Sequence, residues 1–104
     1  MARILQRRAA RRDLIQHFVY LAEHAGLETA RRFRRAAEAT YAELGGMPRI
    51  GSPGKLGEGK FARVRLWRVQ GFEKYLILYQ PADDGIVIER VIHAAEDYQR
   101  ILQR

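Results

Sequence analysis

The chain has 104 residues, 47% of them hydrophobic, and carries 19 Lys and Arg against 12 Asp and Glu, a net charge of +7. This length and composition predict one folded domain over residues 1–104 and exclude a disordered tail, while the positive charge favours polyanions or acidic partners. The absence of cysteine excludes disulfides and thiol chemistry, and no stretch matches a signal peptide or a membrane span of roughly 20 apolar residues, so we expect a cytoplasmic protein without membrane association.

The first half of the chain predicts a strand followed by two helices. Residues 3–7 are short and partly apolar, and they can form a strand if a later strand pairs with them. Residues 9–25 carry apolar side chains at helical spacing, and Gly26 can end this helix because it adopts the left-handed conformation easily. Residues 27–44 predict a second helix that buries Ala30, Phe33, Ala37, Tyr41 and Leu44. A link this short makes the pair an antiparallel helical hairpin.

The middle of the chain predicts a loop and then a strand. Residues 45–60 are rich in Gly and Pro, so we expect no regular element there. Residues 61–67 place Ala62, Val64 and Leu66 on one face and Phe61, Arg63, Arg65 and Trp67 on the other. This alternation predicts a strand that is buried on one side.

The last third predicts two more strands and a helix. Residues 72–80 are nearly all apolar from Tyr75 to Tyr79, which is typical of a central strand covered on both faces. Residues 81–85 have strong turn chemistry, and residues 86–93 predict the returning strand. Residues 94–104 predict a short helix with Ile101 and Leu102 pointing inward.

These elements predict an α+β fold. It consists of an N-terminal strand, the antiparallel helical hairpin, a three-stranded antiparallel meander and a short C-terminal helix, with helices on one face of the sheet. The common phosphate-binding, zinc-protease and serine-hydrolase motifs are absent, and the three histidines lack metal-ligand spacing. We therefore expect no cofactor and no metal.

Arginines on two elements are candidate binding residues. Arg31, Arg32, Arg34 and Arg35 lie away from the buried stripe of the second helix, and either bind a polyanion or acidic partner or form a solvated face with Glu28 and Glu38. Arg63 and Arg65 project from the same face of a strand. They either form an anion-binding patch with Lys60 or Arg90, or pair across strands with Glu73 or Glu89.

His93 ends the last strand, and Tyr98 follows it in the predicted terminal helix. His93 can act as a general acid or base near neutral pH. The alternative is structural, with the His held by backbone hydrogen bonds and the Tyr packed in the core.

Several short segments, in this order and spacing, resemble the toxins of the ParE branch of the RelE/ParE superfamily. The resemblance covers almost the whole chain and rests on Asp13-Leu14, Pro48 to Gly51, Arg65-Leu66-Trp67, Gly71-Phe72, Tyr75 to Tyr79, Arg90-Val91-Ile92-His93 and Asp97. It implies a RelE/ParE-like fold and a type II toxin, once called a plasmid stabilisation protein, that is neutralised by a ParD-like antitoxin in a hetero-oligomeric complex.

ParE-branch relatives poison DNA gyrase and block replication, whereas RelE-branch relatives cut messenger RNA in the ribosome. The resemblance favours gyrase, with Arg63, Arg65 and Arg90 as target-binding residues and no catalytic residues, so we expect an inhibitor rather than an enzyme. The alternative is a metal-independent endoribonuclease that uses Arg63, Arg65, Arg90, His93 and Tyr98. Strand alternation places Arg90 and His93 on opposite faces, which argues against this alternative.

Two further expectations concern the partners. The antitoxin is expected on the helical hairpin, through Phe18, Val19, Tyr20, Arg31, Arg34 and Arg35, because the hairpin is rich in arginine and in exposed-looking apolar positions. The family often has Gly and then Ala-Arg after the strand-end His, where this chain has Ala94, Ala95 and Glu96. This difference is the basis of a third hypothesis, an inactive basic binding module.

Overall fold

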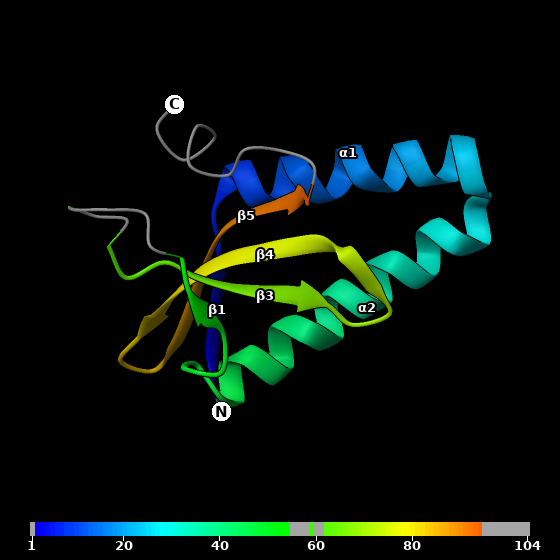
Figure 1. Cartoon of the computed structure of the whole chain (residues 1–104). Coiled ribbons are helices and arrows are strands. Elements are labelled where there is room, and N and C mark those ends of the chain that lie inside the picture. The colour runs from blue at the N-terminus through cyan, green and yellow to red at the C-terminus, as the bar shows by residue number, and fades with distance from the viewer. Residues whose placement is uncertain (1, 55–58, 60–61, 95–104) are drawn as a thin grey trace.

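The computed structural model describes residues 2–54, 59 and 62–94. The elements in chain order are β1 (Arg3–Gln6), α1 (Arg8–Ala25), α2 (Leu27–Gly46), β2 (Ser52–Pro53), β3 (Arg65–Val69), β4 (Phe72–Ala82) and β5 (Gly85–His93) (Figure 1). The strands form one five-stranded sheet in the order β1-β5-β4-β3-β2. β1 pairs parallel to β5, and the other neighbours pair antiparallel. The predicted α+β class is confirmed at this level, because two helices and a sheet pack together.

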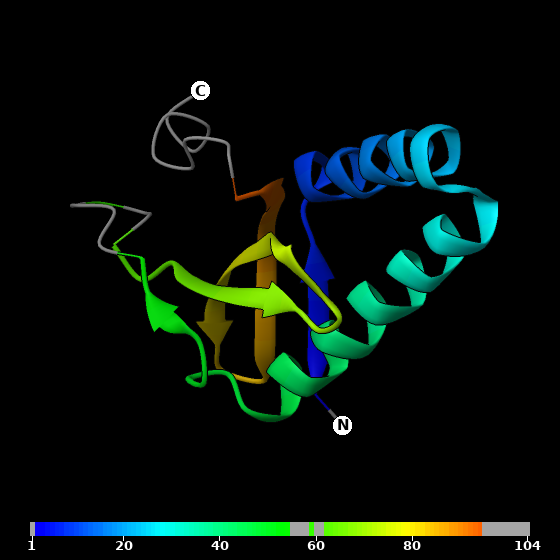
Figure 2. The same cartoon turned by 45° about the vertical axis from the view of Figure 1, so that its right-hand side comes forward.

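The two helices form a hairpin on one side of the sheet. Gly26 joins them with φ of 95°, a left-handed conformation that glycine adopts without a steric penalty. α2 buries the five side chains predicted from its helical spacing, which are Ala30, Phe33, Ala37, Tyr41 and Leu44. Figure 2 shows that the helices diverge from the turn, with α1 near the end of β5 and the second half of α2 beside the sheet.

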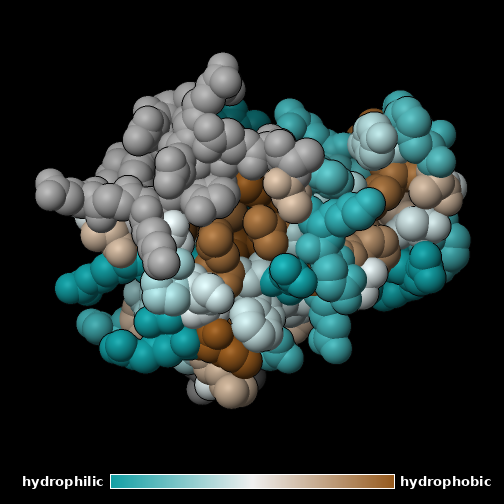
Figure 3. Space-filling model, in the orientation of Figure 1, coloured by the Kyte–Doolittle hydropathy of each residue, from teal (hydrophilic) through white to brown (hydrophobic). Residues whose placement is uncertain are grey.

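Both faces of the sheet carry apolar side chains. On the helix side, Phe33 and Leu44 of α2 pack with Ile77 and Tyr79 of β4 and with Ile88 of β5. On the opposite face a second cluster is formed by Val64, Leu78 and Ile92, with Leu66 and Leu76 packed against it. β4 lies between β3 and β5 and contributes to both clusters, which confirms the prediction of a central strand covered on both faces. Apolar surface also lies over β3 and β4 in Figure 3.

Two sequence predictions need correction. The segment predicted to lack regular structure contains β2, whose Pro53 sits opposite Arg65 on an edge strand, where its missing N–H leaves no ladder bond broken. The strand predicted over 61–67 is shifted to Arg65–Val69 and is not buried on one side only, because Trp67 packs on the helix side and Leu66 on the other. The predicted three-stranded antiparallel meander is present as β3, β4 and β5, and the predicted N-terminal strand is β1, which pairs with β5; only β2, at the other edge, adds a strand that was not predicted.

Turn positions differ slightly as well. β4 continues through Pro81 to Ala82, so the tight turn to β5 is made by Asp83 and Asp84 alone. The helix predicted over residues 94–104, with Ile101 and Leu102, lies outside the described residues except for Ala94, which is in a turn. Within the described part of the chain, neither helix combines the length and apolar character needed to span a membrane.

Candidate functional site

Beyond the end of β1, side chains of α1 bind the backbone at the edge of β5. β1 pairs with β5 only as far as Gln6 opposite Ile88, and the register of β5 against β4 then shifts by one residue. Beyond the shift, the Val91 N–H donates to Asp13 Oδ2 (2.9 Å), and His17 Nε2 lies 2.8 Å from the Val91 carbonyl oxygen. Because Asp13 and His17 are one helical turn apart, one face of α1 satisfies both backbone groups that a strand would have paired.

The same carboxylate holds Arg90. Arg90 Nε donates to Asp13 Oδ2 (2.7 Å) and Arg90 Nη2 donates to Oδ1 (2.9 Å), which is a bidentate ion pair. The Asp13 side chain is 8% exposed and that of Arg90 is 24% exposed. Arg90, predicted as a target-binding residue, is therefore engaged inside the fold. The family-like Asp13-Leu14 and Arg90-Val91 segments contact each other directly.

Arg63 and Arg65 line one hollow together with Arg49, and we call these three side chains the arginine hollow. Its walls also include Pro53, and its volume is about 510 Å³. Arg90 does not line it. Arg49 comes from the loop after α2, so its position depends on the path of that loop, which the sequence pattern did not predict.

Tyr79 fixes the loop that carries Arg49. The buried Tyr79 hydroxyl donates to the Pro48 carbonyl (2.8 Å) and accepts from the Gly51 N–H (2.9 Å). Burial raises the pKa of Tyr79, so the phenol keeps the proton that it donates. Arg65 Nη1 then donates to the carbonyl oxygens of Arg49 (3.2 Å) and Gly51 (2.6 Å). These contacts link the loop from Pro48 to Gly51 to the central strand β4, two segments on which the ParE resemblance rests.

The predicted cross-strand partners of Arg63 and Arg65 make other contacts. Glu89 Oε1 lies 3.4 Å from Arg7 Nε, and Glu89 Oε2 accepts from Gln80. Glu73 accepts from the Gly71 N–H. In the described part of the chain, neither carboxylate pairs with Arg63 or Arg65, and both arginines line the arginine hollow.

The residues of the ribonuclease alternative do not gather at one place in the described structure. His93 pairs with Tyr75 across β5 and β4, with ring centroids 5.2 Å apart, so it lies on the helix side. Arg90 pairs with Leu78, which belongs to the opposite cluster. The two side chains thus lie on opposite faces, as strand alternation predicted. Tyr98 lies outside the described residues.

A groove runs between the two helices. Leu14, Ile15, Phe18 and Phe33 form its apolar lining, and Arg11, Arg34 and Glu38 complete it, with a volume of about 380 Å³. Ile15 is 56% exposed. We call this feature the hairpin groove.

The predicted antitoxin-binding residues spread around the hairpin. Phe18 lines the hairpin groove, but consecutive helical residues point about 100° apart, so Val19 borders the groove and Tyr20 points away from it. Tyr20 stacks on His24 with ring centroids 4.1 Å apart. Arg34 pairs with Glu38 and Arg35 with Glu28, at 3.4 and 3.3 Å, so part of the arginine row forms the solvated ion pairs predicted as its alternative role. Arg31 is exposed.

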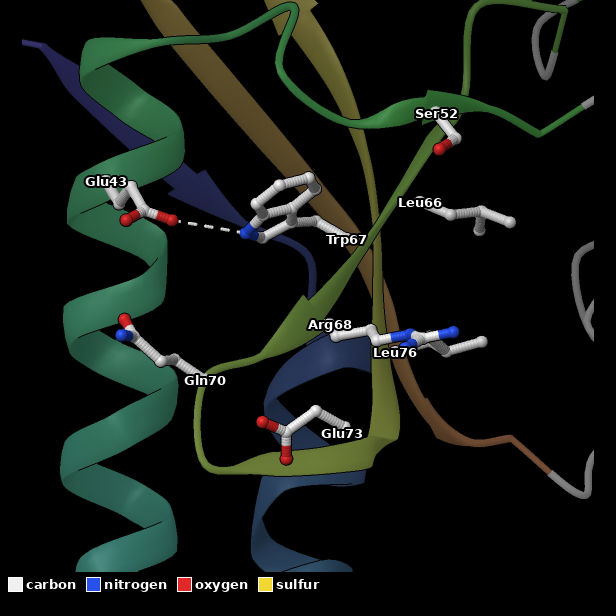
Figure 4. A pocket seen from close by; sticks show the side chains of 8 residues that line it. All are labelled: Glu43, Ser52, Leu66, Trp67, Arg68, Gln70, Glu73 and Leu76. Carbon is white, nitrogen blue, oxygen red and sulfur yellow. Dashed lines mark hydrogen bonds between the residues drawn. The ribbon is translucent and has the colours of Figure 1, made fainter.

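A further hollow, of about 690 Å³, follows the edge of β3 where β2 stops (Figure 4). Trp67 points toward α2, and its Nε1 donates to Glu43 Oε1 (3.2 Å), whereas Leu66 and Leu76 point the other way. Arg68 and Glu73 add charges of both signs. The Trp67–Glu43 hydrogen bond attaches this edge of the sheet to α2. Among the described residues, no group of three or more His, Asp or Glu is arranged to hold a metal ion.

The fold agrees with that of known proteins. A family model described as "ParE toxin of type II toxin-antitoxin system, parDE" matches residues 4–98. The chain belongs to this family. The ParE-type resemblance predicted from short sequence segments is confirmed, and the protein is a member of the type II toxins. No curated protein matches its sequence.

This ParE-family chain is also similar to a solved structure. A chain of the chromosomal ParDE toxin–antitoxin system from P. aeruginosa matches it with 17% identity and a TM-score of 0.71. The match covers 89% of this chain and 96% of that chain. At this identity the similarity shows a shared fold.

Proposed function

We propose that this ParE-family protein poisons DNA gyrase, blocks replication and is neutralised by a cognate ParD-like antitoxin. The family match over residues 4–98 carries the proposal. It is supported by the dispersal of the nuclease candidates, because a metal-independent ribonuclease needs cations and a titratable group around one phosphate. Arg90 is paired with Asp13, and His93 lies on the other face. We therefore keep Arg63 and Arg65 in the proposed target surface and leave out Arg90.

We propose the hairpin groove as the antitoxin site. Its apolar lining and its arginines suit an amphipathic helix that inserts apolar side chains and presents carboxylates to the rim. Phe18 and Arg34 lie in the groove itself. Val19, Arg31 and Arg35 are exposed on the same two helices and stay in the proposed surface, whereas Tyr20 is left out of it because it points away from the groove.

Induced expression of wild-type protein and of His93→Ala tests the gyrase proposal. We expect both proteins to cause DNA breaks and a DNA-damage response while translation continues at first, and both to inhibit supercoiling by purified gyrase. Binding surfaces spread their energy over many residues, so one ring outside the arginine hollow should matter little. Melting of His93→Ala at the wild-type temperature serves as the control for folding.

The ribonuclease alternative makes the opposite prediction. Loss of a general acid or base costs about 10² to 10⁴ in rate. Rapid translational arrest with ribosome-dependent messenger cuts, lost in a His93→Ala variant that melts normally, would contradict the gyrase proposal. Induction without DNA damage or translational arrest would instead support the inactive binding module.

A further inference from the structure

The arginine hollow brings together positive charges from two segments that are distant in sequence. Arg49 follows α2, and Arg63 and Arg65 lead into β3, while Pro53 of β2 and Pro81 at the end of β4 add rigid walls. Asp83 is the one carboxylate among the described lining residues. The hollow therefore has an excess of two positive charges within the described part of the chain.

One guanidinium in the hollow is held in place before any ligand arrives. Arg65 Nη1 is used by the carbonyls of Arg49 and Gly51, and Tyr79 fixes Gly51 in turn. Arg65 Nε and Nη2 make no hydrogen bond with the other described residues, and the side chains of Arg49 and Arg63 make none at all with them. A fixed guanidinium loses less side-chain entropy when it binds an anion than a mobile one.

The lining distinguishes between kinds of anion. No aromatic side chain is among the described lining residues, so a nucleobase would find no stacking surface. A protein partner typically needs buried apolar anchors, and on this molecule those line the hairpin groove. Arginines without anchors or stacking rings fit backbone phosphates, which Arg contacts without reading sequence.

We propose that the arginine hollow binds the phosphodiester backbone of duplex DNA, so that the toxin contacts the DNA held by gyrase as well as the enzyme. This inference rests on the proposed gyrase function, because gyrase is the target that brings DNA to the toxin. Contact with phosphates alone implies binding that is independent of sequence and strongly dependent on salt.

The test is the salt dependence of binding to a short fluorescent DNA duplex, measured by anisotropy for the purified chain. The double variant Arg49→Gln/Arg63→Gln removes two hollow cations and keeps Arg65, which anchors the loop. Arg8→Gln/Arg12→Gln removes the same charge from exposed positions on α1. Each phosphate contact contributes about 0.9 to the slope of log K against log salt, so the hollow variant should lose about 1.8 and the α1 variant close to none.

Three results would overturn the inference. Equal slope changes in both variants would mean diffuse charge rather than a site. Poly-glutamate that binds as tightly as DNA of equal charge, with the same dependence on Arg49 and Arg63, would indicate an acidic protein surface. Tighter binding of single-stranded RNA than of duplex DNA would indicate an RNA ligand.

Gyrase supercoiling assays separate this inference from the proposed function. If the wild-type chain inhibits gyrase but its DNA binding does not depend on the hollow, the proposed DNA contact is disproved and the proposed gyrase function stands. If the chain binds DNA through the hollow but does not inhibit gyrase, the proposed gyrase function is disproved and DNA binding by the hollow stands.

Discussion

Asp13 accepts three hydrogen bonds through one carboxylate, two from Arg90 and one from the Val91 backbone. Asp13 as a whole residue is 6% exposed, so few water molecules can replace these donors. Removal of one partner from a buried pair is costly chiefly because the other charge stays behind unpaired. Asp13 is thus a residue whose loss should weaken the whole fold rather than a local contact.

We expect Asp13→Asn to lower the free energy of unfolding by about 2–4 kcal/mol, somewhat below the range for fully buried pairs because part of Arg90 reaches solvent. Urea unfolding measures the change. Glu38→Gln, which breaks the exposed pair with Arg34, is the matched control and should cost less than about 1 kcal/mol. Equal losses in the two variants would contradict the structural role assigned to Asp13.

Three buried tyrosines, Tyr41, Tyr75 and Tyr79, have a pKa that burial raises, and they make the fold sensitive to alkaline pH. Burial raises the pKa of Tyr41, whose hydroxyl accepts from Gln6 Nε2 (3.0 Å), and also raises that of Tyr79. In the unfolded chain a tyrosine hydroxyl ionises at about pH 10. Above that pH the unfolded chain therefore releases protons that the folded chain retains. The stabilisation is complete below about pH 10 and is lost as pH rises toward the folded-state values.

We therefore expect the free energy of unfolding to fall steeply above about pH 10, and to fall less steeply in Tyr41→Phe. Denaturant unfolding at a series of alkaline pH values, together with the absorbance of tyrosinate, measures the effect. Tyr20→Phe is the control, because Tyr20 is 55% exposed. An unchanged pH profile in Tyr41→Phe would rule out this explanation.

Sequence patterns predicted which residues form the core, but they did not predict which polar residues pair across long distances in the sequence. The buried residues of α2 follow from a repeat of three and four, which one sequence displays directly. The Asp13–Arg90 pair joins positions in α1 and β5, and neither local pattern indicates the other. Arg49 was missed for the same reason, since the Tyr79 contacts with Pro48 and Gly51 fix its loop.

At the scale of elements, the sequence predicted strands with long apolar runs well, but it predicted edge strands and strand ends poorly. β4 was evident because its residues are apolar on both faces. β2 has two residues, one of them proline, and only its pairing with β3 makes it a strand. The start of β3 was misplaced because the alternation of apolar and polar residues continues through residues 62–64, which precede the first residue paired with β4, Arg65.

The parallel contact between β1 and β5 depends on the absence of a side chain at Gly85. Gly85 pairs with Arg3, and an added Cβ would overlap the Arg3 carbonyl oxygen. We expect Gly85→Ala to push the two strands apart and to cost about 1–3 kcal/mol or more, measured by thermal unfolding. Gly46→Ala is the control at the end of α2, where the added carbon meets no atom within 4 Å beyond its chain neighbours and the backbone of its own helix. Its stability should be unchanged or slightly higher.

At the scale of the whole molecule, the hairpin groove and the arginine hollow use different elements. The groove lies between α1 and α2, and the hollow lies among β2, β3 and the end of β4. A partner can therefore occupy one without competing for the same side chains. Neutralisation and target contact should be separable by mutation.

We expect Ile15→Glu to weaken the complex with the antitoxin at least about tenfold, because it places a carboxylate in an apolar groove that faces an acidic partner. Tyr20→Glu is the matched control on the same helix, with nearly the same exposure (55% against 56%) but pointing away from the groove. Both variants should still inhibit gyrase. Titration calorimetry with purified antitoxin measures the difference, and equal weakening would place the antitoxin elsewhere.

The pairing of β1 with β5 also has a consequence for how the protein folds. The helical hairpin and the antiparallel strands join neighbours in sequence, whereas Arg3 must find Gly85 across most of the described chain. Closure of such a long loop is slow relative to local contacts. During synthesis, β1 has no partner and α1 lacks the Val91 anchor until β5 has emerged. The complete sheet can therefore form only after β5 has been synthesised, and a nascent chain that stops before Gly85 cannot assemble it.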